Sequence, residues 1–431
     1  MRMEASQSFR ISRRRLRNKM KSYFPINADR IREDLEALAR FNSTPGEGVT
    51  RLPFTEEARE ACEFLKERFV AAGLETREDA IGNIIGVLPG KDRELPAIAM
   101  GSHYDTVYNG GMFDGQAGVV SALEIARCLK EQGIQPKRDL VVIAFNDEEG
   151  VRFHRSYLGS YGILGRDQQQ AIRDYKDRDG ISIKEAMISW GMDPDRIGEA
   201  AWDWKKVRAF IELHIEQGPV LDSEGLELGI VQSVVGFRRY MVTVHGRADH
   251  SGTTPMDLRS DAVDTASRVI AWMGDFARSG NDGTVATAGY LRVEPCVENI
   301  VPSSCEFSAE VRSEHAESLD AFTEGLMEKL GEYSRFCGTN FDVIEKMDIP
   351  PVKLSGDLCD ILEESCKSRG LSHKRMHSGA GHDAQEIASA CETVMIFAPS
   401  RDGRSHCREE WTDFEDIAKA AAAAYDLVIG L

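Results

Sequence analysis

Three consecutive acidic residues, Asp147, Glu148 and Glu149, follow an apolar run from Leu140 to Phe145. Carboxylates this close raise one another's pKa or push the chain apart. A cluster of them at the rim of a core therefore indicates a bound cation or a shared proton. A solvated turn after a strand is the alternative, and this segment alone does not decide between the two.

Further residues with metal-binding chemistry stand at the ends of other apolar segments. Residues 96–107 predict a buried strand that ends in polar residues. Residues 207–218 alternate in polarity, so that Glu212, His214 and Glu216 share one face of a predicted strand. The polar residues that these segments and the neighbouring loops contribute are His103, Asp105, Asp114, Glu148, Glu149, His214 and His406.

The elements around these residues predict a parallel sheet. Apolar residues recur at helical spacing from Asp114 to Gly133, between the predicted strands 96–107 and 140–145. Strand, helix and strand in this order form a right-handed parallel βαβ unit, whose ligands gather at the carboxyl ends of the strands. Another strand, 393–397, leads into the loop with the last candidate histidine. All the candidates are therefore expected at one sheet edge.

Imidazole and carboxylate groups are ligands that divalent zinc, manganese, cobalt or nickel accept, and no thiolate is needed. The candidates suffice for two ions if one carboxylate bridges them. Two ions about 3.5 to 4 Å apart would neutralise Asp114 and Glu149 and leave Glu148 free as a base. The three acids in a row are then explained by cations bound to their neighbours.

Residues 236–348 have a different pattern. Their expected order, β-α-β-β-α-β, is that of a split βαβ sandwich, which is an α+β, ferredoxin-like arrangement. Because the candidate ligands lie before and after this stretch in the sequence, we expect an inserted lid domain. The expected strands are RRYMVTVHG, TVATAGYLRVE, SSCEFSAEVRS and FDVIEKM, and the expected helices lie near 258–275 and 317–334.

The rest of the chain is expected to be an α/β catalytic domain, a mostly parallel sheet flanked by helices, in two parts, 24–235 and 349–431. A chain of 431 residues is too long for one ordinary core. No run of eighteen apolar residues occurs, so no membrane span is expected. The nine cysteines are scattered and form no CxxC pair, which fits neither a disulfide framework nor a zinc ribbon and favours a reducing cytoplasm.

The net charge of −18 hides an asymmetry. Residues 1–22 carry eight Arg or Lys and one Glu, so the rest of the chain is near −25. A body this acidic is not expected to bind nucleic acid. The arginine cluster is similar to a twin-arginine signal, but no apolar segment follows it, so residues 1–23 are expected to be a mobile, solvated leader.

Seven motifs resemble those of the M20 metallopeptidase superfamily, and most closely those of its hydantoinase/carbamoylase amidase branch. The resemblance runs from about residue 27 to the end of the chain, in matching order. It departs from the pattern at EPCVEN and at the cysteine after SH, which removes no ligand. The motifs are GSHYDTVYNGGMFDGQAG, NDEEGVRF, ELHIEQGPVL, GRADHSGTTPM, ENIVP, SGAGHDA and PSRDGRSHCREEWT.

The resemblance implies two metal sites that share Asp114. One ion would be bound by His103, Asp114 and His214, and the other by Asp114, Glu149 and His406. Asp105 matches the acid that orients the imidazole of His103, and Glu148 matches the general base.

The resemblance also implies a substrate site, in which His250 reaches from the lid of a partner subunit, so that the protein is a homodimer through its lid. From the residues alone, a turn residue in a Gly-rich loop is the favoured interpretation of His250, which the family match reverses. Arg312 has, from the sequence alone, no better than an even chance of binding a substrate carboxylate rather than being a surface arginine. The residues that match substrate-binding positions are Gln217, His250, Asn299, Arg312, Gly379, Ala380, Gly381 and His382.

The activity that the resemblance implies is hydrolysis of an N-carbamoyl-L-amino acid, a small ureido acid, to the amino acid, ammonia and carbon dioxide. The peptidase branches usually carry an acid where His214 stands, so this histidine favours ureido over peptide substrates. Allantoate or another ureido acid is an alternative substrate. A dipeptidase and a catalytically silent metal-binding dimer are the remaining alternatives, and the presence of Glu148 argues against the latter.

Overall fold

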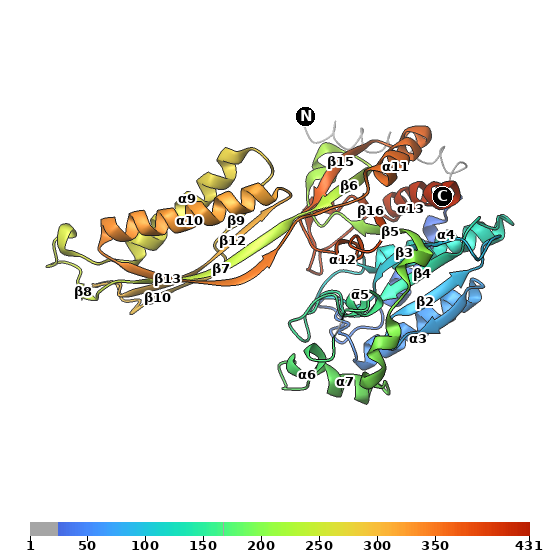
Figure 1. The fold of residues 1–431 in the computed structure, drawn as a ribbon, viewed down its shortest axis with the longest axis horizontal. Helices are drawn as coiled ribbons and strands as arrows, with labels where there is room; N and C mark the ends of the chain where they lie inside the picture. Colours follow the sequence, from blue (N-terminus) through green and yellow to red (C-terminus); the bar gives the residue numbers. More distant parts are fainter. Residues whose placement is uncertain (1–24, 167) are drawn as a thin grey trace. The chain divides into compact units, whose positions relative to one another are not determined.

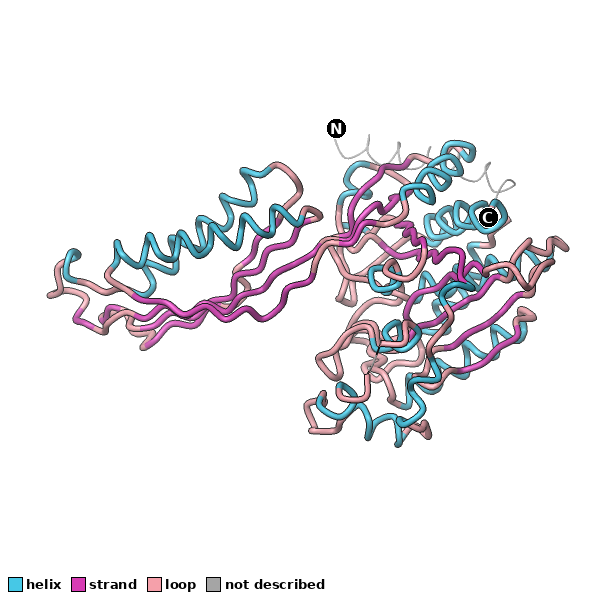
Figure 2. Tube along the Cα trace, in the orientation of Figure 1, coloured by secondary structure: helices cyan, strands magenta, loops and turns pink. Residues whose placement is uncertain are grey.

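The structure is a computed structural model that describes residues 25–166 and 168–431. The expected basic leader, residues 1–23, lies outside these residues. The chain forms two compact units, which Figures 1 and 2 trace in full. The large unit comprises the described part of Met1–Gln232 together with Leu354–Met376 and His382–Leu431, and the insert unit comprises Ser233–Lys353 and His377–Gly381.

A mixed sheet of nine strands has the order β1-β2-β4-β3-β5-β16-β6-β14, with β15 paired to β6. The central strands β4, β3, β5 and β16 are parallel, and antiparallel pairs flank them. The α/β arrangement expected from the sequence is therefore confirmed, with parallel pairing at the centre of the sheet and antiparallel pairing at both ends. The strands are β1 (Glu75–Glu78), β2 (Ile84–Leu88), β3 (Ala97–His103), β4 (Leu140–Phe145), β5 (Val207–Ile215), β6 (Leu228–Val234), β14 (Val352–Lys353), β15 (His373–Ser378) and β16 (Glu392–Ala398).

The register of the parallel strands aligns their carboxyl ends. His103 on β3 lies opposite Phe145 on β4, and Phe397 on β16 lies opposite His214 on β5. The expected strand 207–218 ends at residue 215, because Gln217 adopts a positive φ of 58° and a proline follows two residues later. Glu216 consequently accepts the backbone N–H groups at the start of α8 instead of extending the strand.

Helices cover the large sheet (Figure 1). The capping side chains Asn27 and Thr55 accept backbone N–H groups in the first turns of α2 and α3. The final helix α13 packs its run of buried alanines against α2, α4 and α11, because small side chains permit close approach. The longer helices are α2 (Ala28–Leu38), α3 (Glu56–Ala71), α4 (Gln116–Glu131), α11 (Gly356–Arg369) and α13 (Phe414–Gly430), and the shorter ones are α5 (Leu158–Ile163), α6 (Ala171–Asp174), α7 (Ile183–Ser189), α8 (Val220–Glu224), α12 (Asp383–Ile387), η1 (Pro194–Ala200), η2 (Trp204–Lys206) and η4 (Arg401–Gly403).

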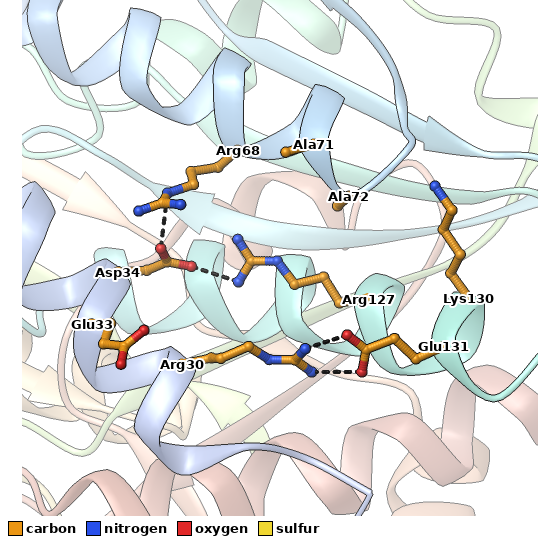
Figure 3. Close-up of a pocket in the computed structure, with 9 residues that line it drawn as sticks. All are labelled: Arg30, Glu33, Asp34, Arg68, Ala71, Ala72, Arg127, Lys130 and Glu131. Atoms are coloured by element: carbon orange, nitrogen blue, oxygen red, sulfur yellow. Dashed lines mark hydrogen bonds and ion pairs between the residues drawn. The ribbon is translucent and has the colours of Figure 1, made fainter.

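A cavity of about 420 Å³ lies among α2, α3 and α4 (Figure 3). The buried Asp34 carboxylate in this cavity pairs with Arg127 at 2.6 Å and with Arg68 at 3.1 Å. Arg30 pairs with Glu124 at 2.7 Å and also with Glu131. Charges here satisfy one another and join the three helices, and none of the predicted site residues lines the cavity. We interpret it as a structural ion-pair network.

The insert unit has a sheet of order β10-β12-β7-β13, with β9 also paired to β12, and the helices α9 and α10 pack on one face of it (Figure 1). A separate two-stranded pair joins β8 to β11. Its elements are β7 (Gly236–His245), β8 (Asp249–His250), η3 (Met256–Leu258), α9 (Ala262–Gly280), β9 (Val285–Thr287), β10 (Leu291–Glu294), β11 (Ile300–Val301), β12 (Ser304–Ser313), α10 (Ala316–Cys337) and β13 (Asn340–Ile349).

Two expectations for this unit need adjustment. The single strand expected over 284–294 is divided into β9 and β10, because the Ser308 hydroxyl accepts the N–H groups of Gly289 and Tyr290 where the ladder is interrupted. The helix expected near 258–275 begins later, because the Asp261 side chain caps the N–H groups of the next turn. Within the described residues, no helix is long and apolar enough to cross a membrane.

Candidate active site

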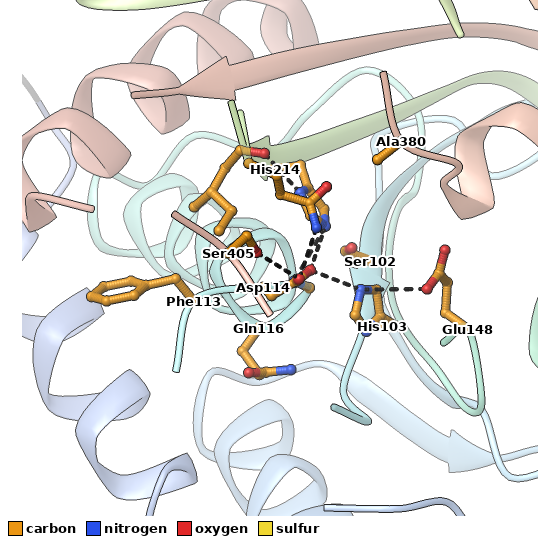
Figure 4. A network of polar contacts seen from close by, with 12 residues as sticks. Ser102, His103, Phe113, Asp114, Gln116, Glu148, His214, Ala380 and Ser405 are labelled. Atoms are coloured by element: carbon orange, nitrogen blue, oxygen red, sulfur yellow. Dashed lines mark hydrogen bonds and ion pairs between the residues drawn. The ribbon is translucent and has the colours of Figure 1, made fainter. Parts of the chain in front are cut away.

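The carboxylate of Asp114 lies among three imidazoles (Figure 4 shows its contacts with His103 and His214). Asp114 Oδ1 is 3.4 Å from His103 Nε2 and 3.2 Å from His214 Nε2. Asp114 Oδ2 is 3.2 Å from His406 Nε2. Each oxygen of this carboxylate therefore faces a different set of imidazoles, as a bridging ligand would.

Different elements position these side chains. His103 is the last residue of β3, and His214 lies near the end of β5. Asp114 precedes α4 and is followed by Gly115, which has a φ of +72°. A Cβ on Gly115 would lie 2.4 Å from the ring of His103, so only glycine fits there. His406 lies in the loop after η4 with a φ of +55°.

Backbone carbonyls orient two of the imidazoles. His103 Nδ1 is 3.1 Å from the carbonyl oxygen of Asp105, and His214 Nδ1 is 2.9 Å from that of Ile215. A nitrogen in this position donates its hydrogen to the carbonyl, which leaves Nε2 with its lone pair. In agreement with this tautomer, His214 Nε2 accepts the backbone N–H of Gly115 at 3.3 Å. In the neutral imidazoles both lone pairs would face Asp114, so a proton or a cation must lie between each Nε2 and the carboxylate.

The acidic segment after β4 reaches the same cluster. Glu148 Oε2 is 3.9 Å from His103 Nε2, and Glu149 Oε1 is 3.5 Å from His406 Nε2. The carboxylate of Asp105 accepts the backbone N–H groups of Glu148 and Glu149 at 3.0 and 3.2 Å. Its Oδ1 is 3.6 Å from His103 Nδ1. The carboxylate of Asp105 therefore positions the acidic segment, whereas the group of Asp105 within hydrogen-bond distance of His103 Nδ1 is its backbone carbonyl.

A buried hydrogen-bond network anchors the backbone next to this acidic segment. The Asn83 side chain accepts the N–H of Asn146 at 3.0 Å and donates to Asp79 at 2.8 Å and to the carbonyl oxygen of Gly159 at 3.1 Å. Asp147, in the left-handed region with a φ of 58°, is fully buried. Its two carboxylate oxygens have no hydrogen-bond partner in the described part of the chain. The network fixes the backbone from which the neighbouring glutamates project.

The pKa values at the site express an excess of buried negative charge. Burial, with a further contribution from Asp114, raises the pKa of Glu149 to about 8. Burial also raises the pKa of Glu148 well above its usual range, against the opposing effect of His103. Burial alone would raise the pKa of Asp114 too, but hydrogen bonds from the imidazoles hold it well below the usual range. Cations at this site would relieve the repulsion between these groups.

The pKa values of two histidines in the cluster are raised as well, in their case by the neighbouring carboxylates. A hydrogen bond to Asp114 raises the pKa of His406 to about 9, although burial opposes it. Burial would lower the pKa of His103, but the surrounding carboxylates, first that of Glu148, raise it well above its usual range. Protons on these imidazole nitrogens therefore lie where divalent cations would lie in the metal-bound enzyme.

The donor atoms fit a pair of divalent cations. The ligand atoms of His103, Asp114 and His214 all lie within 4.8 Å of one another, and so do those of Asp114, Glu149 and His406. These two groups share Asp114 and coincide with the two ligand sets that the sequence motifs imply. Nitrogen and oxygen donors without thiolate are suited to zinc, manganese, cobalt or nickel.

Two residues expected to bind substrate lie beside the cluster. Gln217 Nε2 donates to Asp114 Oδ2 at 2.8 Å and is 3.4 Å from His406 Nε2. The ring of His382 packs edge-on against that of His214, with centroids 4.5 Å apart. Burial lowers the pKa of His382 well below its usual value, so its imidazole is neutral.

The other expected substrate-binding residues belong to the insert unit. His250 on β8 and Asn299 lie close together, because the N–H of Ser251 donates to the carbonyl oxygen of Asn299. Arg312 on β12 donates to the carbonyl oxygen of Gly379 at 3.0 Å. The remaining two members are Ala380, whose carbonyl accepts the Ser378 hydroxyl at 2.8 Å, and Gly381.

Sequence motifs do not identify a buried acid beside the cluster. Glu410 is 3% exposed, and it accepts the backbone N–H of Asp114 and the hydroxyl of Ser405. Burial, followed by the charge of Asp114, raises its pKa to about 7. Nothing in the run REE distinguishes Glu410 from the exposed Glu409, so only the structure could reveal it.

Comparison with known proteins identifies the family. The model of the peptidase family M20/M25/M40 matches residues 99–429. An N-carbamoyl-L-amino-acid amidohydrolase of Paenarthrobacter aurescens is 45% identical over 91% of this chain and 95% of its own length. An allantoate amidohydrolase of Escherichia coli is 38% identical over 90% of this chain and 94% of its own length.

Solved structures agree with these relatives. The crystal structure of a hydantoinase/carbamoylase family amidase from Burkholderia multivorans has a TM-score of 0.89 and 29% identity, and the match covers 94% of this chain and 98% of that one. The family model, the similar sequences and the fold point in the same direction, as did the motifs. This chain belongs to the M20/M25/M40 peptidase family, as an enzyme of the hydantoinase/carbamoylase amidase branch.

Proposed function

We propose that the enzyme is a dinuclear metal-dependent amidohydrolase that converts an N-carbamoyl-L-amino acid to the free amino acid, ammonia and carbon dioxide. The observation that carries the proposal is the carboxylate of Asp114, whose two oxygens face two different ligand groups. His103 and His214 complete one group, and Glu149 and His406 complete the other. When bound, two divalent cations supply Lewis acidity, which acidifies a water and polarises the ureido carbonyl.

Glu148 is the proposed general base. It is 7% exposed and lies beside both ligand groups without completing either of the two that share Asp114. Its carboxylate accepts the proton of the attacking water and returns it to the departing amino nitrogen. The C–N bond breaks to give the amino acid and carbamic acid, which decomposes to ammonia and carbon dioxide. The hydrogen bonds that the backbone N–H groups of the acidic segment donate to the Asp105 carboxylate hold the base in place.

His250 is the proposed donor to the oxygen anion of the transition state. Its Nδ1 accepts the backbone N–H groups of Gly252 and Thr253 at 3.0 and 3.3 Å. A ring nitrogen that accepts carries no hydrogen, so Nε2–H is free to donate. The side chain is exposed and therefore available to a ligand or to a second copy of the chain. These contacts support the proposed role, which the motif GRADHSGTTPM also favours.

We propose that the enzyme acts as a homodimer in which the lid of one copy completes the site of the other. Many of the exposed large hydrophobic side chains lie in the insert unit, and Leu291 on β10 and Ile344 on the edge strand β13 are 60% and 55% exposed. An edge strand with exposed apolar residues suits pairing between subunits. Sedimentation equilibrium of the purified chain tests the dimer directly.

A substrate panel tests the activity. Ammonia release is measured for N-carbamoyl-L-amino acids and allantoate, and release of free amino acids is measured for dipeptides, with zinc, manganese, cobalt and nickel in turn. We expect N-carbamoyl-L-amino acids to have the highest kcat/KM. The 38% identity to an allantoate amidohydrolase makes allantoate the second candidate. Preferential cleavage of dipeptides would contradict the proposal, and no turnover with any metal would favour the silent dimer.

A further inference from the structure

Glu410 joins the two loops that carry Asp114 and His406. Its Oε1 accepts the backbone N–H groups of Phe113 and Asp114, both at 3.1 Å, and its Oε2 accepts the hydroxyl of Ser405 at 2.7 Å. The Ser405 Oγ is also 3.2 Å from Asp114 Oδ2. One carboxylate therefore connects backbone on one side of the cluster to the residue just before the histidine on the other side.

The carboxylate of Glu410 is closely packed against its neighbours. A Cβ on Gly111 would lie 2.2 Å from Glu410 Oε1, so a larger residue at this position would displace the carboxylate. The ring of Phe113 packs edge-on against that of Trp411 with centroids 5.4 Å apart. Glu410 therefore has little freedom to move relative to the segment that it holds.

His406 needs such support more than the other ligand histidines do. His103 and His214 lie on strands, and their side chains are 2% and 1% exposed. His406 lies in a loop, with a side chain that is 51% exposed. The backbone N–H of Arg401 donates to the carbonyl oxygen of Trp411 at 2.8 Å. This hydrogen bond closes the base of the loop but does not reach His406.

We propose that Glu410 is a positioning residue that holds Asp114 and His406 at the separation required by the cation that they share with Glu149. It touches neither that ion nor the substrate. The inference rests on the proposed dinuclear function and deepens it, because it predicts unequal effects on the two ions. Loss of Glu410 should weaken the ion bound by His406 and spare the ion bound by His103 and His214.

Metal affinity, measured on the apo-enzyme by titration with zinc against a chromophoric chelator, tests the proposal. Partners that orient metal ligands typically contribute about 10- to 100-fold in affinity. We therefore expect Glu410→Ala to lower the affinity for one ion by about that factor and to leave the other within about twofold. The matched control is Glu409→Ala, an adjacent acid with a side chain that is 45% exposed, which should bind both ions as the wild type does.

A double-mutant comparison identifies the weakened ion. In the His406→Ala background, Glu410→Ala should have no further effect on the remaining ion, whereas in the His103→Ala background it should weaken the ion that is left. Equal weakening of both ions together with a lower Tm of the apo-enzyme would mean that Glu410 acts only on the fold, and would overturn the proposal.

Conservative variants keep the test decisive if Glu410→Ala does not fold. Glu410→Gln retains an oxygen that can accept the N–H groups of Phe113 and Asp114, so it should keep most of the affinity. Ser405→Ala removes one of the hydrogen bonds and should have a smaller, equally selective effect. Unchanged affinities in Ser405→Ala, or equal weakening of both ions in Glu410→Gln, would refute the role of Glu410. A wild-type enzyme that binds fewer than two ions would instead refute the dinuclear function.

Discussion

The ligand cluster of the large unit and the His250 loop of the insert unit hold their imidazoles in opposite ways. In the cluster, His103 and His214 are almost fully buried and donate to backbone carbonyls, so that Nε2 offers a lone pair. In the insert unit, His250 is exposed and accepts from backbone N–H groups, so that Nε2 offers a hydrogen. The hydrogen bonds of the same side chain thus suit a metal ligand in one unit and a hydrogen-bond donor in the other.

The ligand cluster is formed within one chain, whereas the proposed role of His250 involves a second chain. The cluster is formed within the large unit, from strand ends and loops whose backbones are hydrogen-bonded to one another. The loop of His250 is also locally ordered by its own turn, but the role that we propose for it requires a substrate and a second copy of the chain. Mutations in the two units should therefore have different effects on metal binding and on catalysis.

The largest effect is expected for Asp114→Ala, which removes a ligand from both proposed ions at once. The variant should lose both ions and all measurable turnover. Elemental analysis after dialysis against metal-free buffer measures the ion content. Retention of two ions per chain would show that another carboxylate forms the bridge.

Glu148→Gln should separate catalysis from metal binding. The amide cannot accept the proton of the attacking water, so kcat should fall at least about 10²-fold, which is the usual contribution of a general base. The ion content and the Tm should match those of the wild type. As the matched comparison, Glu149→Gln alters a proposed ligand and should lose metal. Turnover near that of the wild type in Glu148→Gln would exclude this residue as the base.

The structure brings together the candidate ligands that the sequence grouped, whereas some bounds of the surrounding elements differ from those expected. Types and spacing indicate candidate ligands such as His103, which ends an apolar strand, because parallel strands end at one edge of the sheet. The gap between β9 and β10 could not be predicted, since it depends on the Ser308 hydroxyl from another strand. The contacts of Glu410 and Asn83 could not be predicted either, because both residues bind backbone groups that are distant in the sequence.

Mixing two inactive variants tests whether the donor comes from a second copy. His250→Ala chains lack the donor, and Glu148→Gln chains lack the base. If the lid of one copy completes the site of the other, each heterodimer has one site with both residues intact. Random re-annealing should then restore about a quarter of the wild-type activity, given isologous pairing. No recovery in a sample with proven heterodimers would place the donor within its own chain or remove its role.

The smallest effect is expected at Arg312, on the insert side of the comparison. Its Nε donates to Glu310 at 2.9 Å and its Nη1 to the carbonyl oxygen of Gly379 at 3.0 Å, while its guanidinium lies 5.0 Å from the ring centroid of Phe237. These contacts fix the plane of the group, and the side chain remains 31% exposed, so its other N–H groups can meet a substrate carboxylate.

Lysine keeps the charge of Arg312 but not the planar fork, so Arg312→Lys should raise KM for N-carbamoyl-L-amino acids about tenfold, or about 1.4 kcal/mol, with little change in kcat. Arg239→Lys is the control, because Arg239 also pairs with Glu310 but matches no substrate-binding position. A substrate analogue whose carboxylate is replaced by a carboxamide sharpens the test: wild type and Arg312→Lys should then have similar KM values. If the variant discriminates against the carboxamide as strongly as the wild type does, Arg312 does not bind the substrate carboxylate, and its contacts serve only the insert unit.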